Sequence, residues 1–402
     1  MEKLRNISVV DPARCTGCGA CAQVCPTAAI AMKSDEEGFL APVIDGQTCI
    51  HCTACQKVCH TLKLPAAKGS GGDTAYAAYL RERKLRSHSA SGGVFAKAAQ
   101  TILREGGAVY GAAWDDTLTV RHAGVTEEAD LKKLQGSKYV QSDTSTVFRA
   151  VRESLQTGRK TLFSGTPCQV AALYAFLGED PENLLTMDLI CHGTPSPGFF
   201  RRYCAESGGS YGQVTAYQFR TRRKIGAPKS EFIAKITYEG STTKLSHHDN
   251  DAFFRMFLKG IMFRKSCYTC PYANLNRLGD ITIGDCDSAD RYGVKWQSMS
   301  ASTVIIHSGK GQRLWDAIAD EFDFISLDLA YEAQRNAQLS GPFFMPPERE
   351  GLFQRLGEMS WEEIQTTCAL PEGRNTRLKN TLRQFIPYEM SLKRSTAGGG
   401  KK

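Results

Sequence analysis

Short apolar runs alternate with amphipathic stretches through the middle of the chain. Residues 75–80 form one such run and favour a β-strand. Residues 91–105 place apolar side chains at helical spacing, and Gly106 marks where that helix should end. Residues 108–114 and 119–125 then predict two strands paired across a polar turn.

Two further apolar runs end in glycine-containing turns. The strand expected over residues 161–163 leads through a turn at 164–168 into a helix over 169–177. Residues 184–190 repeat this scheme and end at residues 191–193. Strand, turn, helix and strand in succession predict an α/β sheet with parallel neighbours. Ligands bind beyond the carboxyl ends of such strands, which is where these two turns would lie.

The patterning also divides the chain. Residues 1–65 are dense in cysteine and loops, and a linker rich in Gly, Ala and Ser is expected over 66–74. Residues 75–345 carry the alternating strands and helices, with an N-terminal part to about 150 and a C-terminal part from about 160. Residues 346–402 predict a helical extension with a disordered Gly-Lys tail at 395–402.

Eight of the fifteen cysteines form two runs with the spacing of bacterial ferredoxins. The fourth cysteine of each run ligates the other cluster in two-cluster proteins of this kind. The first 4Fe-4S cluster is therefore assigned to Cys15, Cys18, Cys21 and Cys59. The second is assigned to Cys25, Cys49, Cys52 and Cys55.

Zinc and disulfides are the alternatives for these cysteines. Structural zinc uses sets of four cysteines with a longer gap between pairs, and disulfides suit oxidising compartments. The doubled spacing favours clusters over both. His60 stands where the first run has Pro26, and we expect it to change a turn rather than a ligand.

Composition indicates the cellular compartment of the protein and where its charge is concentrated. The 402 residues are 42% hydrophobic and 23% charged, as in ordinary globular proteins of two or three domains. No apolar run approaches the ~20 residues of a membrane helix, and residues 1–14 do not resemble a signal peptide. A reducing cytoplasm is therefore expected. The net charge of +8 peaks at residues 81–86 and 220–224, which form solvated faces or an entrance for an acidic ligand or partner. Nucleic-acid binding is not expected, since no motif for it accompanies the charge.

Six short motifs follow one another after residue 75. They are Ser91-Gly92-Gly93, Gly136-Ser137-Lys138-Tyr139-Val140, Gly165-Thr166-Pro167-Cys168-Gln169, Cys191-His192-Gly193, Cys267 with Cys270-Pro271, and Gly279-Asp280-Ile281-Thr282-Ile283-Gly284-Asp285. In this order they resemble the coenzyme F-420 hydrogenase/dehydrogenase beta-subunit family over roughly residues 75 to 310. The resemblance implies an α+β and α/β fold: a bacterial-type ferredoxin domain followed by a mixed α/β flavin-binding domain. It also implies non-covalent FAD beside a 4Fe-4S cluster.

Four cysteines outside the two runs lie in or beside predicted turns: Cys168, Cys191, Cys267 and Cys270. They predict a closed four-thiolate site, interpreted as a third 4Fe-4S cluster because its ligands are soft. Zinc in the same four sulfurs is one alternative. Another is a catalytic thiol at Cys168, whose pKa a helix N-terminus would lower. Cys286 is a fifth candidate ligand.

The flavin site lacks the Gly-x-Gly-x-x-Gly fingerprint. Ser91, Gly92 and Gly93 precede a helix, whose N-terminus suits a phosphate. Lys138 is expected to neutralise the pyrophosphate or lie near the flavin ring, with an ordinary surface lysine as the alternative. From the family motifs, the further candidates for flavin contacts are Gly165, Thr166, Pro167 and Asn274.

Catalysis is assigned to Lys138 and His192. His192 follows a proposed cluster ligand and is expected to pass a proton to the reduced flavin or a substrate, although a structural role is the alternative.

The expected function is an iron–sulfur flavin-dependent oxidoreductase. It would relay electrons between FAD and 4Fe-4S clusters, coupling coenzyme F-420, NAD(P)H or a small organic substrate to ferredoxin or another redox protein. The alternative is an electron-transfer beta subunit of a larger hydrogenase, dehydrogenase or reductase complex, with no substrate of its own. A cluster-bearing binding module is a third, less favoured class.

Overall fold

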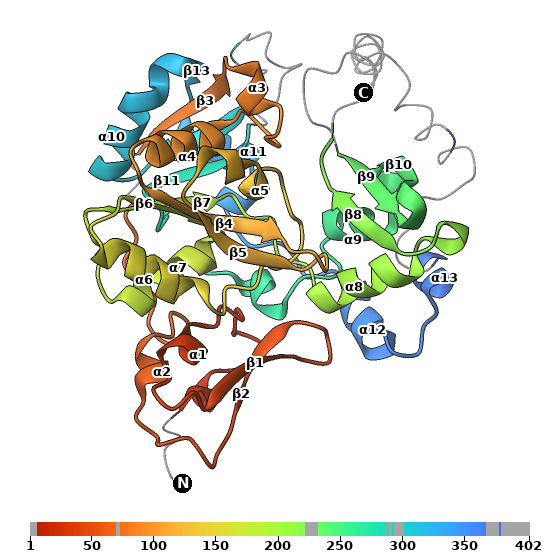
Figure 1. The fold of residues 1–402 in the computed structure, drawn as a ribbon. Helices are drawn as coiled ribbons and strands as arrows, with labels where there is room; N and C mark the ends of the chain where they lie inside the picture. Colours follow the sequence, from red (N-terminus) through yellow and green to blue (C-terminus); the bar gives the residue numbers. More distant parts are fainter. Residues whose placement is uncertain are drawn as a thin grey trace.

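The computed structural model describes residues 6–69, 73–221, 232–286, 288, 292, 301–366 and 378. A small N-terminal module lies at one end of a large α/β body, and a smaller lobe stands beside that body (Figure 1). The basic residues 222–224 and the tail at 395–402 lie outside the described residues. Among the described helices, none is long and apolar enough to cross a membrane.

The N-terminal module consists of a hairpin and short helical turns. Strands β1 (Ile30–Ser34) and β2 (Leu40–Ile44) pair antiparallel, with Ile30 opposite Ile44. Helices α1 (Ala20–Val24) and α2 (Ala54–Lys57) follow the two cysteine loops, and a 3-10 turn, η1 (Ile7–Val9), packs beside them. One small cluster of this module buries Ile7, Cys21, Ile30 and Cys55, and Ala29 and Phe39 are also buried. Such a small core relies on bound metal for stability.

An eight-stranded mixed sheet organises the body, in the order β13-β3-β12-β11-β7-β6-β4-β5. Strands β4, β6, β7 and β11 run parallel, as the sequence predicts for the neighbours at 161–163 and 184–190. Strands β5, β12 and β13 run antiparallel to their neighbours. The strands are β3 (Thr74–Leu80), β4 (Ala108–Trp114), β5 (Val120–Val125), β6 (Thr161–Gly165), β7 (Leu184–Leu189), β11 (Ile281–Asp285), β12 (Ser302–Ile306) and β13 (Phe322–Ser326).

Helices cover both faces of this sheet. On one face, α4 (Val94–Arg104) and α10 (Gly309–Ile318) pack against strands that include β3, β4 and β11. On the other face, α6 (Val147–Gln156) and α7 (Pro167–Leu177) pack against β4, β6 and β7. Alternate residues of each buried strand therefore enter different cores. Shorter helices occur at α3 (Arg83–Arg86), α5 (Leu131–Leu134) and α11 (Leu329–Arg335).

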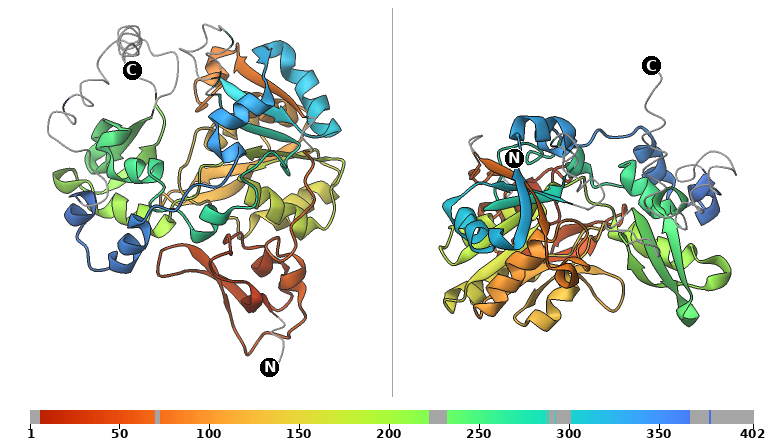
Figure 2. Two further views of the ribbon diagram at one scale, coloured as in Figure 1. Left: turned by 180° about the vertical axis from the view of Figure 1, so that it is seen from behind. Right: turned by 90° about the horizontal axis from the view of Figure 1, so that it is seen from above.

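The smaller lobe contains an antiparallel sheet of β8 (Val214–Gln218), β9 (Ile233–Tyr238) and β10 (Thr243–His247). Helices α8 (Pro197–Glu206) and α9 (Ala252–Leu258) share an aromatic core with it. Figures 1 and 2 show α12 (Glu348–Arg355) and α13 (Trp361–Ile364) beside this lobe, although they come from the expected C-terminal extension. Leu352 and Trp361 enter its core.

The expected linker is held in place where the structure describes it. The backbone N–H groups of Lys68 and Gly69 both donate to the carbonyl of Arg277. The Lys68 ammonium lies 2.7 Å from the buried carboxylate of Asp280 and 2.8 Å from that of Asp180. This part of the linker therefore belongs to the packed body.

Candidate functional site

The first four-cysteine set lies in the N-terminal module, where the module meets the body. Burial raises the pKa of Cys18 to about 12, and the neighbouring Cys15 and Cys59 thiols raise it further. The pKa of Cys21 is raised by burial and then by Cys18, Cys15 and Cys59. The structure therefore brings together the three cysteines of the first run and the last cysteine of the second. This is the exchanged set that the spacing predicts.

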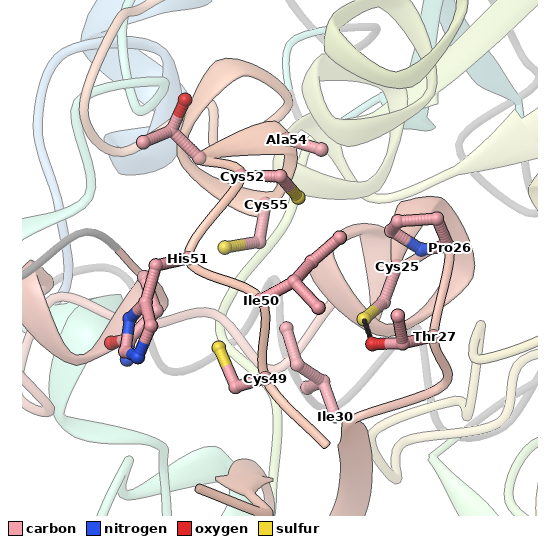
Figure 3. A pocket seen from close by; sticks show the side chains of 12 residues that line it. Cys25, Pro26, Thr27, Ile30, Cys49, Ile50, His51, Cys52, Ala54 and Cys55 are labelled. Carbon is pink, nitrogen blue, oxygen red and sulfur yellow. Dashed lines mark hydrogen bonds between the residues drawn. The ribbon is translucent and has the colours of Figure 1, made fainter. Parts of the chain in front are cut away.

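The second set surrounds a pocket in the N-terminal module (Figure 3). Cys25, Cys49, Cys52 and Cys55 all line it, and it holds about 300 Å³ of empty space, part of which is continuous with solvent. Cys52 is exposed, and the intervening Ile50 is 62% exposed. This set therefore borders the molecular surface.

The loop that carries the second set is tightly wound. His51 and Thr53 both adopt left-handed backbone conformations, with φ of 53° and 63°. Non-glycine residues rarely do so unless their surroundings impose it. The winding brings three cysteines spaced three apart in sequence around one space (Figure 3).

The third set comes from three separate segments of the body. Cys168 lies in the first turn of α7, Cys191 follows β7 by two residues, and Cys267 and Cys270 belong to and follow the 3-10 segment η6 (Lys265–Thr269). Burial raises the pKa of Cys168, and Cys270, Cys191 and Cys267 raise it further. Burial likewise raises the pKa of Cys191 to about 12, and the neighbouring Cys267 and Cys270 thiols raise it as well. The four predicted ligands are therefore close neighbours.

Cys286 lies apart from these four thiols. Its sulfur is 3.8 Å from the Ser288 hydroxyl. After burial, the strongest influence that raises its pKa is the carboxylate of Glu332. The geometry therefore gives Cys286 a different environment from that of the four-thiolate set.

The spacing of the sulfurs bears on which metal they suit. Four thiolates around zinc, with Zn–S bonds of about 2.3 Å, would hold their sulfurs about 3.8 Å apart. Among the described cysteine, histidine and acidic side chains, only His247, His248 and Asp249 form a trio with all ligand atoms within 4.8 Å of one another. The described cysteines of the three sets form no such compact trio. The choice of clusters over zinc in the third set stays a prediction.

One buried arginine connects two loops of the third set. The Arg277 guanidinium donates to the carbonyl of Tyr272 at 2.9 Å and to the carbonyl of Leu189 at 2.6 Å. It also pairs with the Asp188 carboxylate at 3.1 Å. Tyr272 follows Cys270 by two residues and Leu189 precedes Cys191 by two, so Arg277 positions both ligand loops. In the sequence, the only signal of this residue's role is its place soon after the Cys267–Cys270 pair, and it was not predicted.

Hydroxyl and amide groups approach two of these sulfurs. The Thr166 hydroxyl lies 3.1 Å from the Cys168 sulfur. The Thr194 hydroxyl and N–H lie 3.4 and 3.5 Å from the Cys267 sulfur. Hydrogen bonds to cluster thiolates tune the reduction potential.

The predicted flavin residues before α4 are partly engaged in packing. The Ser91 hydroxyl donates to the Ala301 carbonyl at 2.7 Å, and the Gly92 N–H donates to the Ser302 hydroxyl at 2.9 Å. A Cβ on Gly92 would clash with the backbone of Ala78 and Ser302. Glycine is therefore required at Gly92 by the approach of two strands. Gly93 has a φ of 90° and precedes α4, whose N-terminus has no side-chain cap.

Lys138 lies on a loop that contacts the segment before α4. Its ammonium donates to the carbonyls of Lys133 and Gln135. The side chain of Gln135 in turn donates to the Leu85 carbonyl at 3.1 Å and to the Ser89 hydroxyl at 3.3 Å. Burial lowers the pKa of Lys138 to about 7. Because both of these acceptors are uncharged carbonyls, an added anion would stabilise its charged form.

The remaining predicted flavin contacts have structural roles in the loops that carry Cys168 and Cys270. Gly165 ends β6, Thr166 caps α7 in a capping box with Gln169, and Pro167 opens the helix directly after Thr166. The Asn274 side chain donates to the Pro271 carbonyl and accepts from the Asn276 N–H. These residues therefore border the third cysteine set.

His192 lies among three aromatic rings. The rings of Phe257, Phe263 and Phe343 surround it with centroid distances of 5.3, 5.5 and 4.7 Å. One ring nitrogen is 3.4 Å from the Leu258 carbonyl, and burial lowers the pKa of the imidazole. A neutral His192 in this position packs against the smaller lobe and orients the turn after Cys191.

Comparison with known proteins gives two family matches. Residues 158–327 match a family model that describes the C-terminal part of the beta subunit of coenzyme F-420 hydrogenase/dehydrogenase. Residues 14–62 match the 4Fe-4S dicluster domain. The first match contains the whole third cysteine set, and the second contains both ferredoxin runs. The segments around Ser91 and Lys138 precede the residues matched by the beta-subunit model.

A chain of the F-420-reducing NiFe hydrogenase complex from Methanosarcina barkeri is similar to this chain at 17% sequence identity. The similarity covers 68% of this chain and 96% of that chain, with a TM-score of 0.42. No curated protein sequence matches the chain.

Proposed function

Because the chain belongs to the coenzyme F-420 hydrogenase/dehydrogenase beta-subunit family and carries a 4Fe-4S dicluster domain, we propose that it is an iron–sulfur flavoprotein oxidoreductase. It relays electrons between a flavin site at the carboxyl ends of the strands of the large sheet and a redox partner that docks at the N-terminal module. Three sets of cysteines hold 4Fe-4S clusters along this route.

The arrangement of the three cysteine sets carries the proposal. The second set borders the surface at Cys52, and the first set lies where the module meets the body. The third set, whose cysteines are half-buried, lies beyond it, at the carboxyl ends of β6 and β7. A series from surface to interior suits single-electron transfer, and Cys52 with Ile50 offers the outer end to ferredoxin or another redox protein.

FAD is proposed at the sheet edge beside the third set. Ser91, Gly92 and Gly93 with Lys138 would hold its phosphates, and Gly165, Thr166, Pro167 and Asn274 lie toward the cluster. Lys138 supports this placement, because its ammonium is partly buried and an anion would complete its environment. Bound FAD would accept electrons in pairs and release them singly.

The two-electron partner is proposed to be coenzyme F-420, NAD(P)H or a small organic substrate. Arg220 supports an acidic ligand because its buried guanidinium lies at the carboxyl end of β11. This guanidinium also pairs with Asp285 at 2.5 Å. His192 would hold the turn after Cys191 in place and remain neutral.

A second candidate function is that of an electron-transfer subunit in a larger complex. Phe344 is 82% exposed and the adjacent Met345 is also exposed. Such an apolar pair before α12 suits a protein contact. A subunit of this kind would transfer electrons only when its partner is bound.

Iron counting tests the three-cluster assignment. The anaerobically reconstituted chain should contain about twelve irons, and Cys191→Ser or Cys267→Ser should lower the count to about eight. Cys204→Ala is the matched control, because Cys204 is buried in the core of the smaller lobe. About eight irons in the unchanged protein would exclude the third cluster.

Flavin content and bleaching test the rest of the proposal. Lys138→Met should lose FAD, whereas Lys133→Met, in the preceding helix α5 and largely exposed, should retain it. Reduced coenzyme F-420, NADH, NADPH and reduced ferredoxin are then added separately under anaerobic conditions. Bleaching by a hydride donor supports the oxidoreductase. If none of them bleaches the intact protein, the partner-dependent subunit is favoured.

A further inference from the structure

His60 joins the N-terminal module to the body through two hydrogen bonds. It is only 1% exposed. Its Nδ1 lies 2.6 Å from the Tyr272 hydroxyl, and its Nε2 lies 2.9 Å from the Thr16 hydroxyl. Tyr272 belongs to the body and is itself buried. A single imidazole therefore spans the boundary between the two parts.

Each partner in this chain of hydrogen bonds is close in sequence to a predicted cluster ligand. Thr16 follows Cys15, and His60 follows Cys59, so both adjoin the first set. Tyr272 follows Cys270 of the third set by two residues. The hydrogen bonds therefore connect the segments that carry ligands of the first and third cysteine sets.

The surroundings of Tyr272 support the same connection. Tyr272 belongs to a buried hydrophobic cluster. Cys18 of the first set packs against this cluster, and so do Cys168 and Cys270 of the third set. Cysteines of both sets therefore pack against the same buried core.

Further contacts hold the first set against the body. Arg264, which is buried, donates to the carbonyl of Cys15 at 2.6 Å. The Thr144 hydroxyl donates to the carbonyl of Cys18 at 2.7 Å. Both contacts act on the loop of the first run, so the boundary is fixed around these ligands.

His60 can be compared with the residue at the same position after the first cysteine run. The equivalent residue of the first run is Pro26, which lines the surface pocket of the second set and is exposed. The residue that follows the second run faces the body, and this residue is histidine rather than proline. Histidine therefore stands at the boundary with the body, where its ring nitrogens can form hydrogen bonds.

We propose that His60 and Tyr272 are positioning residues that fix the first cluster site beside the third and provide the contact through which electrons pass. One electron moves across per step: the cluster held by the first set is oxidised by one electron and that held by the third is reduced by one, or the reverse. No bond is formed or broken and no proton is transferred. The inference rests on the proposed third cluster and makes the first set the inner cluster of the module.

Two pairs of variants test this inference in the reconstituted full chain. Tyr272→Phe removes the hydroxyl, and Tyr110→Phe is its matched control, since Tyr110 is also buried and bonds to the Ala150 carbonyl at 3.0 Å. His60→Leu removes both hydrogen bonds at similar volume, and His60→Gln retains hydrogen-bonding groups. Iron content is measured first in every variant.

Freeze-quench electron paramagnetic resonance then follows reduction of the third cluster after electrons enter through the module. The reduction should be several-fold slower in Tyr272→Phe and His60→Leu, whereas Tyr110→Phe and His60→Gln remain near the unchanged protein. In the fully reduced state, the spin–spin broadening between the two clusters should weaken in the same two variants. This static signature does not depend on turnover.

The outcomes separate this inference from the function on which it rests. About twelve irons with unchanged transfer rates and broadening in Tyr272→Phe and His60→Leu would overturn the positioning role alone. About eight irons in the unchanged protein would remove the third cluster, and with it the proposed relay. Equal slowing in Tyr110→Phe would also overturn the inference, because a general loss of packing would then explain it.

Discussion

Arg349 donates two hydrogen bonds from a fully buried guanidinium to the carboxylate of Glu37. One joins Nη1 to Oε1 at 3.0 Å and the other joins Nη2 to Oε2 at 2.5 Å, while Nε donates to the Phe263 carbonyl. Glu37 lies in the turn between β1 and β2, and Arg349 lies in α12. This pair ties the hairpin of the N-terminal module to a helix 312 residues later.

Replacing Glu37 should separate these two elements. Glu37→Gln leaves the Arg349 charge buried with no counter-charge, and breaking a buried pair in this way costs about 3–5 kcal/mol. The midpoint of anaerobic urea unfolding should fall accordingly. Glu36→Gln is the control, because Glu36 is exposed. Equal midpoints in the two variants would contradict the role of the pair.

Two glycines allow the hairpin turn to approach α8. A Cβ on Gly198 would lie 2.6 Å from the Cα of Gly38, and the backbone there cannot give way as a flexible side chain would. Gly198→Ala should therefore destabilise the docked module by about 1–3 kcal/mol. Limited proteolysis should then cleave the module faster. In the same module, Gly46 has no atom within 4 Å of such a Cβ, so Gly46→Ala should leave the cleavage rate unchanged.

His122 makes stability depend on pH. The ring is buried, bonds to Ser142 and to the Ser164 carbonyl, and stacks on Phe163. Burial lowers its pKa to about 4; the charge of Lys138 acts in the same direction and that of Asp143 opposes it. Between the usual pKa near 6.5 and this value, the unfolded chain binds a proton that the native chain excludes. Stability from this group is therefore complete above about pH 6.5 and is lost as the pH falls toward 4.

The effect is measurable by urea unfolding at two pH values. Lowering the pH from 7.5 to 5 should cost about 2 kcal/mol through His122. His122→Gln should lose that part of the pH dependence, whereas His88→Gln, at an exposed position, should keep it. The same pH dependence in both variants would show that another group is responsible.

Arg277 should raise the reduction potential of the cluster in the third set. Its positive charge favours the thiolates of Cys191 and Cys270, and it would also favour the more negative reduced cluster. Arg277→Gln should lower the midpoint potential in an anaerobic redox titration. Because Asp188 is then left buried without its partner, unfolding should also become easier by about 3–5 kcal/mol.

The double variant Arg277→Gln with Asp188→Asn separates these effects. It removes the stranded carboxylate, so stability should partly recover while the potential stays low. Arg313→Gln, at a largely exposed arginine, is the control for loss of one positive charge. An unchanged potential in Arg277→Gln would show that the guanidinium acts only on loop position.

The cysteine chemistry could be predicted because its signal is local. Spacings of two and three residues bring Cys15, Cys18 and Cys21 into one loop, and the doubled run indicates the exchange with Cys59. The carboxyl ends of β6 and β7 were likewise predictable, because each strand is a short apolar run followed by a glycine-containing turn. The assembly of Cys168 and Cys191 with the later pair follows from that sheet.

The contacts between distant segments could not be predicted. His60 carries no sign in the sequence that Tyr272, 212 residues later, will be its partner. The sequence suggests that Gly92 is a glycine because it contacts a ligand phosphate, but the close approach of two strands already requires glycine there. Lys68 lies in a stretch with linker composition, yet the buried Asp280 holds it. In each case the decisive partner is supplied by tertiary packing, which single-sequence patterns do not contain.

The exposed edge at Cys52 and Ile50 also determines how dioxygen would damage the protein. An oxidant arriving from solvent reaches the second cysteine set most readily, because Cys52 is exposed whereas the described cysteines of the other two sets are half-buried or buried. Brief exposure to air should therefore remove the outer cluster first. With the flavin and the two inner clusters bound as proposed, the damaged protein would keep these groups connected but would be cut off from its proposed redox partner.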